Sequence, residues 1–136
     1  MWTCPSCNRK FRNANQNHTC TLVSKDELFA KRPDFLKKLY NKIVDEVSRF
    51  GEYREETVLP DVIFFKTRST FLAVKVKKDH LEVEFFLDHH EDDPSIAKWL
   101  QTSKRRFAHV VKADSEEDIT TQLTEWIKRS YYLILS

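Results

Sequence analysis

The sequence contains a single glycine, Gly51, among its 136 residues. Loops that wrap around the phosphates of nucleotides need several glycines at fixed spacing, so this class of site is excluded. The chain also lacks any apolar run close to the roughly 20 residues that span a bilayer. Its first residues contain neither the basic stretch nor the apolar stretch of a signal peptide. We therefore expect a cytoplasmic protein that has no membrane partner.

Catalytic signatures are also missing. No nucleophile lies at a supporting distance in sequence from a general base, and the histidines and carboxylates are scattered. The sequence therefore identifies no catalytic residue, and we do not expect an enzyme. The formal net charge is only +2, which by itself demands no nucleic acid partner. Hydrophobic residues make up 40% of the chain and aromatic residues 12%, which favours a globular domain over a disordered one.

Cysteine is absent after residue 20, and all three cysteines lie before it. Cys4, Cys7, His18 and Cys20 form a C-x2-C-x10-H-x-C pattern. Two thiolates from a C-x-x-C turn, a histidine and a third thiolate complete the tetrahedral ligand set of a structural zinc ion. Free thiols or a disulfide are the alternative, but a reduced compartment favours the metal. We expect one structural Zn²⁺, a zinc finger at residues 1–22 and an α+β domain at residues 23–136.

The finger also carries the chain's clearest resemblance to a known family. The segments CPSCNRKF and NQNHTC, followed by RST-F at Arg68–Phe71, RRFAH at Arg105–His109 and a closing helix with Trp126, resemble a family of small bacterial proteins of unknown function. In that family a short zinc finger precedes an α+β domain similar to YjbR-like domains. Asn8 and Ala30 depart from it, because glycine is frequent at both positions. The resemblance implies a fold and a metal, and it carries no activity.

The segment Asp61–Asp88 predicts a three-stranded antiparallel meander. Two-residue turns at Arg68-Ser69 and Lys78-Asp79 fix the register of its strands. One face of the meander is then continuously apolar, and Lys75 lies opposite Glu82 on the other face. The apolar pairs that this register predicts are Ile63 with Val74, Phe65 with Leu72, Leu72 with Phe85, Val74 with Val83 and Val76 with Leu81.

The second face of this meander allows two interpretations. The register gathers Phe64, Phe71 and Phe86 there, with Val62, Lys66 and Lys75 around them. Aromatic rings on an open sheet, flanked by lysines, stack the bases of single-stranded nucleic acids in several protein classes. A helix or the loop after Asp88 can instead cover the rings, and we favour this second arrangement because aromatic clusters more often serve packing.

The remaining segments complete an α+β fold. Apolar residues at helical spacing predict a helix from Asp34 to about Phe50, ending at Gly51, and a last helix begins near Asp114 or Ser115. Ser24 and Glu27 predict a capping box for a short helix before Pro33, and Ile96–Leu100 is interpreted as a short helical turn. Tyr53–Leu59 and Phe107–Val111 read as further strands. We expect an antiparallel sheet of about four to five strands packed with N- and C-terminal helices.

The polar loop His89–Pro94 contains residue types that bind metals, but nothing in the sequence fixes their geometry, so we interpret it as a solvated turn. His109, on a strand, is interpreted as a structural residue. The C-terminal Tyr-Tyr-Leu-Ile-Leu segment is apolar, and we expect it to dock on the core.

Two binding functions remain open. The first is contact with nucleic acid or a nucleic-acid-processing protein, with phosphate contacts from basic side chains and stacking from phenylalanine. The second is a protein-interaction or regulatory module with a purely structural finger. The sequence predicts no oligomeric state. The residues assigned to nucleic-acid contact are Arg9, Lys10, Phe11, Arg12, Lys66, Lys75, Lys104, Arg105 and Arg106.

Overall fold

The computed structural model describes residues 2–3, 10–11, 25–58 and 61–135. The predicted zinc ligands Cys4, Cys7, His18 and Cys20 lie outside these ranges, as do Arg9, Arg12 and the capping residue Ser24. The elements are β1 (Trp2–Thr3), β2 (Lys10–Phe11), α1 (Lys25–Ala30), α2 (Asp34–Val47), β3 (Arg54–Val58), β4 (Val62–Lys66), β5 (Thr70–Val76), β6 (Leu81–Leu87), β7 (Ile96–Ser103), β8 (Arg106–Ala113), the 3-10 turn η1 (Glu116–Asp118) and α3 (Thr121–Leu135).

The main sheet has six antiparallel strands in the order β3-β4-β5-β6-β8-β7, and β1 and β2 form a separate antiparallel pair. The α+β class is confirmed, whereas the expected four to five strands were too few. The difference comes from Ile96–Ser103, which is strand β7 rather than a helical turn. This segment pairs with β8 along one edge of the sheet, and seven of its eight residues are exposed, so it has no buried helical face.

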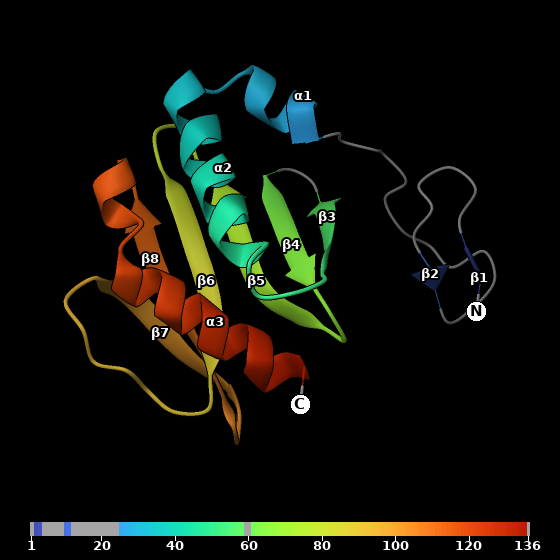
Figure 1. Cartoon of the computed structure of the whole chain (residues 1–136), viewed down its shortest axis with the longest axis vertical. Coiled ribbons are helices and arrows are strands. Elements are labelled where there is room, and N and C mark those ends of the chain that lie inside the picture. The colour runs from blue at the N-terminus through green and yellow to red at the C-terminus, as the bar shows by residue number, and fades with distance from the viewer. Residues whose placement is uncertain (1, 4–9, 12–24, 59–60, 136) are drawn as a thin grey trace.

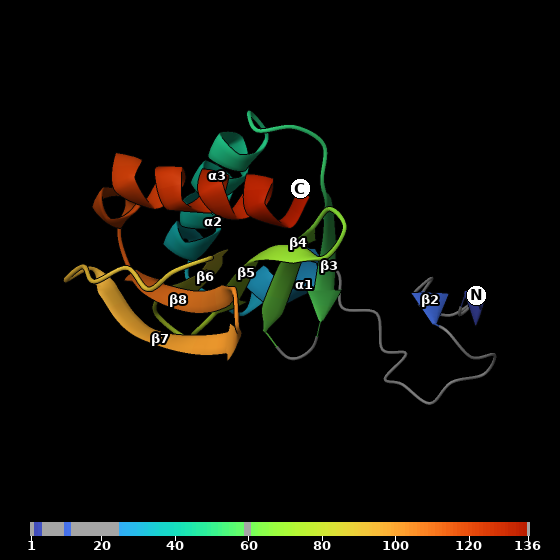
Figure 2. The same ribbon diagram turned by 90° about the horizontal axis from the view of Figure 1, so that it is seen from below.

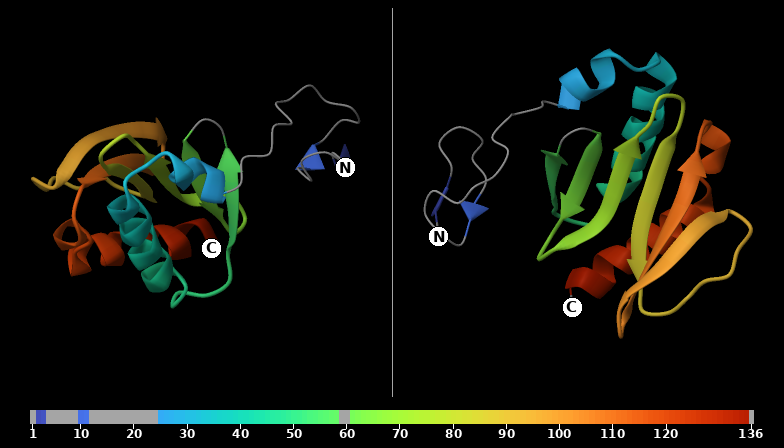
Figure 3. Two further views of the ribbon diagram at one scale, coloured as in Figure 1. Left: turned by 90° about the horizontal axis from the view of Figure 1, so that it is seen from above. Right: turned by 180° about the vertical axis from the view of Figure 1, so that it is seen from behind.

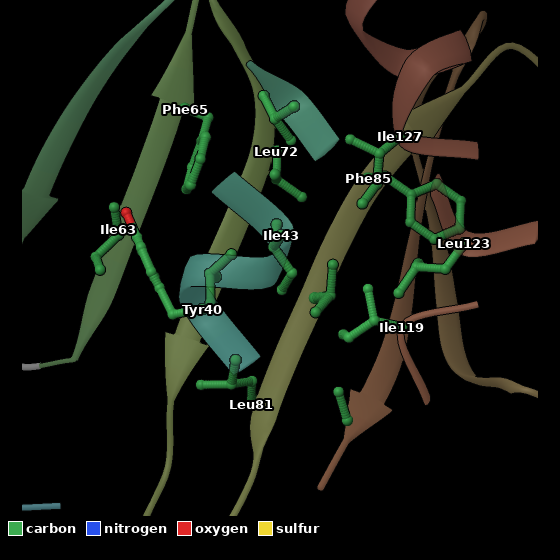
Figure 4. Packing of buried hydrophobic residues seen from close by; sticks show 14 of the residues in the cluster. Tyr40, Ile43, Ile63, Phe65, Leu72, Leu81, Phe85, Ile119, Leu123 and Ile127 are labelled. Carbon is green, nitrogen blue, oxygen red and sulfur yellow. The ribbon is translucent and has the colours of Figure 1, made fainter. Parts of the chain in front are cut away.

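Helices α2 and α3 both lie on one face of the sheet (Figures 1 and 2). The apolar stripe of α2, including Leu36, Leu39 and Ile43, is fully buried against it. In Figure 4, Tyr40 and Ile43 of α2 and Leu123 and Ile127 of α3 point into the same core as side chains of β4, β5 and β6. Phe35, in the first turn of α2, is 40% exposed.

The predicted register of the meander is confirmed at all five apolar pairs and at Lys75 opposite Glu82. It is wrong at the β4–β5 turn, where Lys66 pairs with Thr70 and a bulge at Phe71 shifts the register. A bulge adds one residue to a strand and turns its side chain to the other face. Phe71 therefore enters the core and is fully buried, with its ring 5.0 Å from that of Tyr131.

Ser130 of α3 closes the gap that this bulge leaves between β5 and β6. The ladder between these strands ends at Leu72 and Phe85, so Phe71 and Phe86 do not bond each other. The fully buried Ser130 hydroxyl donates to the carbonyl of Phe71 at 2.6 Å and accepts the N–H of Phe86 at 2.9 Å. A single side chain thus satisfies two backbone groups and fixes α3 to the sheet.

The ends of the helices differ from the predicted ones. Helix α2 ends at Val47 with Ser48 as its C-cap, so Gly51 does not cap it. Gly51 lies in the following segment with φ +148°, and a Cβ there would lie 2.5 Å from the Tyr131 hydroxyl, so both backbone and space require glycine. The acidic turn predicted to start the last helix is the separate 3-10 turn η1, capped by Ser115 and Asp118. Helix α3 begins after Thr120, whose hydroxyl accepts the N–H of Leu123 at 3.0 Å. The C-terminal segment is the end of α3, where Tyr131 is buried and Tyr132 is 49% exposed.

We expect Ser130→Ala to lower the free energy of unfolding by about 2–4 kcal/mol, because it leaves a buried N–H and a buried C=O unpaired. Urea denaturation measures the change. Ser48→Ala is the matched control, since the Ser48 hydroxyl bonds the Val44 carbonyl at an exposed helix end. Equal, small losses in both variants would show that Ser130 does not fix the helix to the sheet.

Candidate functional site

The face of the sheet opposite α2 and α3 is open in the part of the chain that the structure describes (Figure 3, right). The expectation that a helix or the loop after Asp88 covers this face is therefore wrong for the described residues. Phe64 and Phe86 lie on this face and are partly exposed, whereas Phe71 is buried in the core on the other side of the sheet. Ala73, the cross-strand partner of Phe64, lies on β5, between the strands that carry the two rings. Its side chain is a single methyl group, so it does not project between them.

Basic residues dominate this open face. Strand pairing and side-chain alternation assign to it six basic and three acidic side chains. These are Arg54, Lys66, Lys75, Lys98, Arg106 and Lys112, and Glu56, Glu82 and Glu84. Among the described residues, Lys75, Arg106 and Lys112 make no ion pair, and the Arg106 guanidinium donates to the Arg105 carbonyl at 3.0 Å.

Lys66 has a defined position on this face. Its ammonium group lies 2.9 Å from a carboxylate oxygen of Glu56 on the neighbouring strand and 5.8 Å from the centre of the Phe64 ring. A cation near the ring face is attracted by the ring quadrupole. The pairing with Glu56 reduces the charge that Lys66 can offer to a phosphate.

The structure brings together only part of the residue set predicted for nucleic acid. Lys66, Lys75 and Arg106 share the open face, and Lys104 and Arg105 are exposed in the turn between β7 and β8. Lys10 and Phe11 form strand β2, and Arg9 and Arg12 lie outside the described residues. Sequence reasoning missed Lys112, which alternation along β8 would have assigned to this face.

A second polar cluster lies on the helix side, where the 88–93 loop crosses the end of β8. His109 is fully buried, its Nε2 accepts the N–H of Glu91 at 3.0 Å, and its Nδ1–H donates to the Phe107 carbonyl at 3.0 Å. Because Nε2 accepts a hydrogen bond from the backbone N–H of Glu91, it carries no proton, so the imidazole is neutral. Burial lowers the pKa of His109, and the prediction of a structural histidine agrees with these bonds.

His109 is also part of a row of nearly parallel rings. Its ring lies 5.4 Å from that of Phe85, which is 5.4 Å from Trp126 of α3. On the other side His90 stacks at 6.0 Å, and Trp99 of β7 stacks on His90 at 3.9 Å. The loop predicted as a freely solvated turn is therefore held to the domain by ring stacking and by the bond to His109.

His89 lies between two carboxylates of the same loop. Its Nδ1 is 2.7 Å from Asp88 and its Nε2 is 2.8 Å from Glu91, and these hydrogen bonds raise the pKa of His89. With Asp88, Glu125, Arg129 and Tyr132, among others, it lines a hollow of about 440 Å³ beside α3. Charges of both signs line this hollow, so it favours neither anions nor cations.

Among the described residues, no three histidine, cysteine, aspartate or glutamate side chains are grouped so that they could hold a metal ion. Within the same residues, none of the helices has the length and apolar character required to span a membrane.

Comparison with known families identifies this α+β unit. The model of the Domain of unknown function (DUF5655) matches residues 25–134, and the chain therefore belongs to this family. The match begins after the finger motif, so the predicted zinc finger and the similarity to YjbR-like domains stay predictions. Comparison with curated proteins and with solved structures gave no match.

The opposite pKa shifts of His109 and His89 predict opposite effects on stability. A lowered pKa means that the unfolded chain binds a proton near pH 6 that the folded chain rejects, so the contribution of His109 is present above about pH 6.5 and is lost as the pH falls. The contribution of His89, whose pKa is raised, is present below about pH 6.5 and is lost as the pH rises through its folded pKa.

We therefore expect the free energy of unfolding of His109→Gln to be lower than that of the wild type at pH 7, but to fall less between about pH 7 and pH 5. The same measurement on His89→Gln should give a steeper fall than the wild type. Urea denaturation at a series of pH values tests both, and parallel pH profiles for the three proteins would contradict the assignment.

Proposed function

We propose that this chain is a zinc-containing binding module that contacts nucleic acid through the open face of its six-stranded sheet. The observation that carries the proposal is the composition of that face: two partly exposed phenylalanine rings, Phe64 and Phe86, among basic side chains in excess over acidic ones. A flat surface of rings and cations supplies stacking for bases and charge for phosphates.

The distribution of charge supports this proposal, because the positive charge of the open face does not simply follow the net charge of the domain. Residues 1–24 contain three of the 23 basic residues and none of the 21 acidic ones, so the rest of the chain has a slight acidic excess. Its open face nevertheless has six basic residues against three acidic ones. Positive charge is therefore concentrated where a polyanion could lie, while carboxylates gather in the 88–93 and 114–118 segments.

The zinc part of the proposal rests on the ligand pattern Cys4, Cys7, His18 and Cys20. The antiparallel pairing of Thr3 with Lys10 supports it, because this pair flanks Cys4 and Cys7 in sequence. The finger would add Arg9, Lys10 and Arg12 to the phosphate contacts, with Phe11 as a further stacking ring.

Strand β7 supports a second candidate, the protein-interaction module. It is an edge strand, and its Trp99 and Leu100 are 49% and 65% exposed. Edge strands can pair with an extended segment of another protein. Bulges near Ala97 and Thr102 limit the regular part of this edge to four residues, which makes it the weaker candidate.

Removal of charge from the open face should weaken binding in a salt-dependent way. We expect Lys75→Gln/Lys112→Gln to bind a single-stranded oligonucleotide more weakly, with the slope of log K against log salt reduced by about 1.4, or about 0.7 for each lost phosphate contact. Fluorescence anisotropy at several salt concentrations measures the slope.

Lys38→Gln/Lys128→Gln is the matched control, because it removes the same charge from exposed positions on α2 and α3. Equal effects of the two double variants would show that binding depends on the net charge of the protein and not on the open face. A wild-type protein that binds no oligonucleotide even at low salt would leave the protein-interaction module as the better explanation.

Metal analysis of the purified protein should give one zinc ion per chain, and Cys7→Ser should lose it on dialysis, because three remaining ligands hold zinc less tightly. His80→Gln, which changes a histidine outside the motif, should keep the metal. Wild-type protein purified without zinc would refute the zinc part of the proposal, but it would not bear on the proposed binding role of the open face.

A further inference from the structure

Glu84 lies in the middle of the open face. It is on β6, opposite Ala73 of β5 on one side and Val110 of β8 on the other. Phe64 lies beyond Ala73 in the same row, and Phe86 is two residues further along β6 on the same face. A carboxylate is therefore flanked by the two aromatic rings that the proposed function assigns to base stacking.

Among the described residues, Glu84 has no hydrogen-bond or ion-pair partner. The other two acidic residues of the face differ from it: Glu56 pairs with Lys66 at 2.9 Å, and Glu82 lies 3.8 Å from Lys98 and 3.7 Å from His80. The cross-strand neighbours of Glu84 are alanine and valine, which offer no donor. Glu84 is partly buried, and both of its carboxylate oxygens are free to accept hydrogen bonds.

A free carboxylate in the centre of a basic face repels phosphates, so it is unsuited to backbone contact. It is suited to the edge of a base, because aspartate and glutamate accept hydrogen bonds from the amino groups of bases. The Watson–Crick edge of guanine presents two neighbouring donors, N1–H and the N2 amino group, which match the two carboxylate oxygens. Thymine and uracil present one donor between two carbonyl oxygens, which a carboxylate repels.

The dimensions of the sheet allow this contact. Strands β4 and β6 are separated by one strand, so their axes lie about 10 Å apart, and residues two apart on β6 lie about 7 Å apart. A base whose ring rests on Phe86 therefore directs its edge over the neighbouring Glu84. In a duplex this edge is paired with the opposite strand, so the contact requires a single strand.

We infer that Glu84 is a specificity-determining residue that selects guanine over thymine or uracil in a single strand stacked on Phe64 and Phe86. This inference rests on the proposed function. It adds the class of ligand, single-stranded and guanine-containing, and the side chain that recognises the base.

The experiment uses the full chain and fluorescein-labelled thymidine oligomers of about ten nucleotides, a length within the range that small single-strand binders cover. In the test oligomer two central thymidines are replaced by deoxyguanosine. We expect the wild type to bind the guanine-containing oligomer about tenfold more tightly than the all-thymidine one. Glu84→Gln should lose most of this ratio, because the amide presents one donor and one acceptor in place of two acceptors.

Glu82→Gln is the matched control. It removes the same charge from the same strand and face, but from a carboxylate that already has partners. Both variants should bind the all-thymidine oligomer slightly more tightly than the wild type, and only Glu84→Gln should change the ratio. A merely structural role of Glu84 would alter affinity for both oligomers equally.

The outcomes separate the inference from the function on which it rests. Binding of both oligomers with equal affinity by the wild type, or a guanine preference that survives in Glu84→Gln, overturns the role of Glu84 and leaves nucleic-acid binding standing. Tighter binding of the duplex form of the same oligomers also overturns it. Failure of the wild type to bind any of the oligomers removes the proposed function together with the inference.

Discussion

The packing of α2 and α3 against a single face of the sheet is the constraint on which the rest of this structure depends. It buries the apolar side chains of β4, β5 and β6 between sheet and helices, with Ile63, Phe65 and Phe85 fully inaccessible. Because side chains alternate along a strand, covering one face determines the composition of the other. The open face receives every second residue, and these are the lysines, glutamates and partly exposed phenylalanines on which the functional argument relies.

The bulge at Phe71 shows how this constraint operates locally. Strict alternation would leave a third phenylalanine on the open face, but one extra residue in β5 turns Phe71 into the core against Tyr53, Phe65 and Tyr131. The interrupted ladder would leave two buried backbone groups unpaired, and Ser130 of α3 bonds both. The bulge, the serine and the docking of α3 are therefore parts of one arrangement. It gives a smaller aromatic surface on the open face and a firmer attachment of the helix.

The two faces also differ in how their charges are used. On the helix side, His109, His89, Asp88 and Glu91 bond one another or the backbone, and ring stacking from Trp126 to Trp99 ties the 88–93 loop to the domain. These groups serve the structure. On the open side, Lys75, Lys112 and Glu84 have no hydrogen-bond or ion-pair partner among the described residues, and Arg106 bonds only the carbonyl of Arg105. These are the charges that the proposed function assigns to contact with an external ligand.

Local pattern in the sequence determined the meander, the register of its apolar pairs and the apolar stripes of the helices, because alternation and helical spacing are local properties. The zinc ligands are likewise a prediction from spacing alone. Three features were decided only by tertiary structure. The bulge at Phe71 depends on space beside Tyr131, and the strand character of Ile96–Ser103 depends on pairing with β8. The other face is open because α2 and α3 both pack on the same side of the sheet, and no local sequence pattern predicts which face a distant helix will cover.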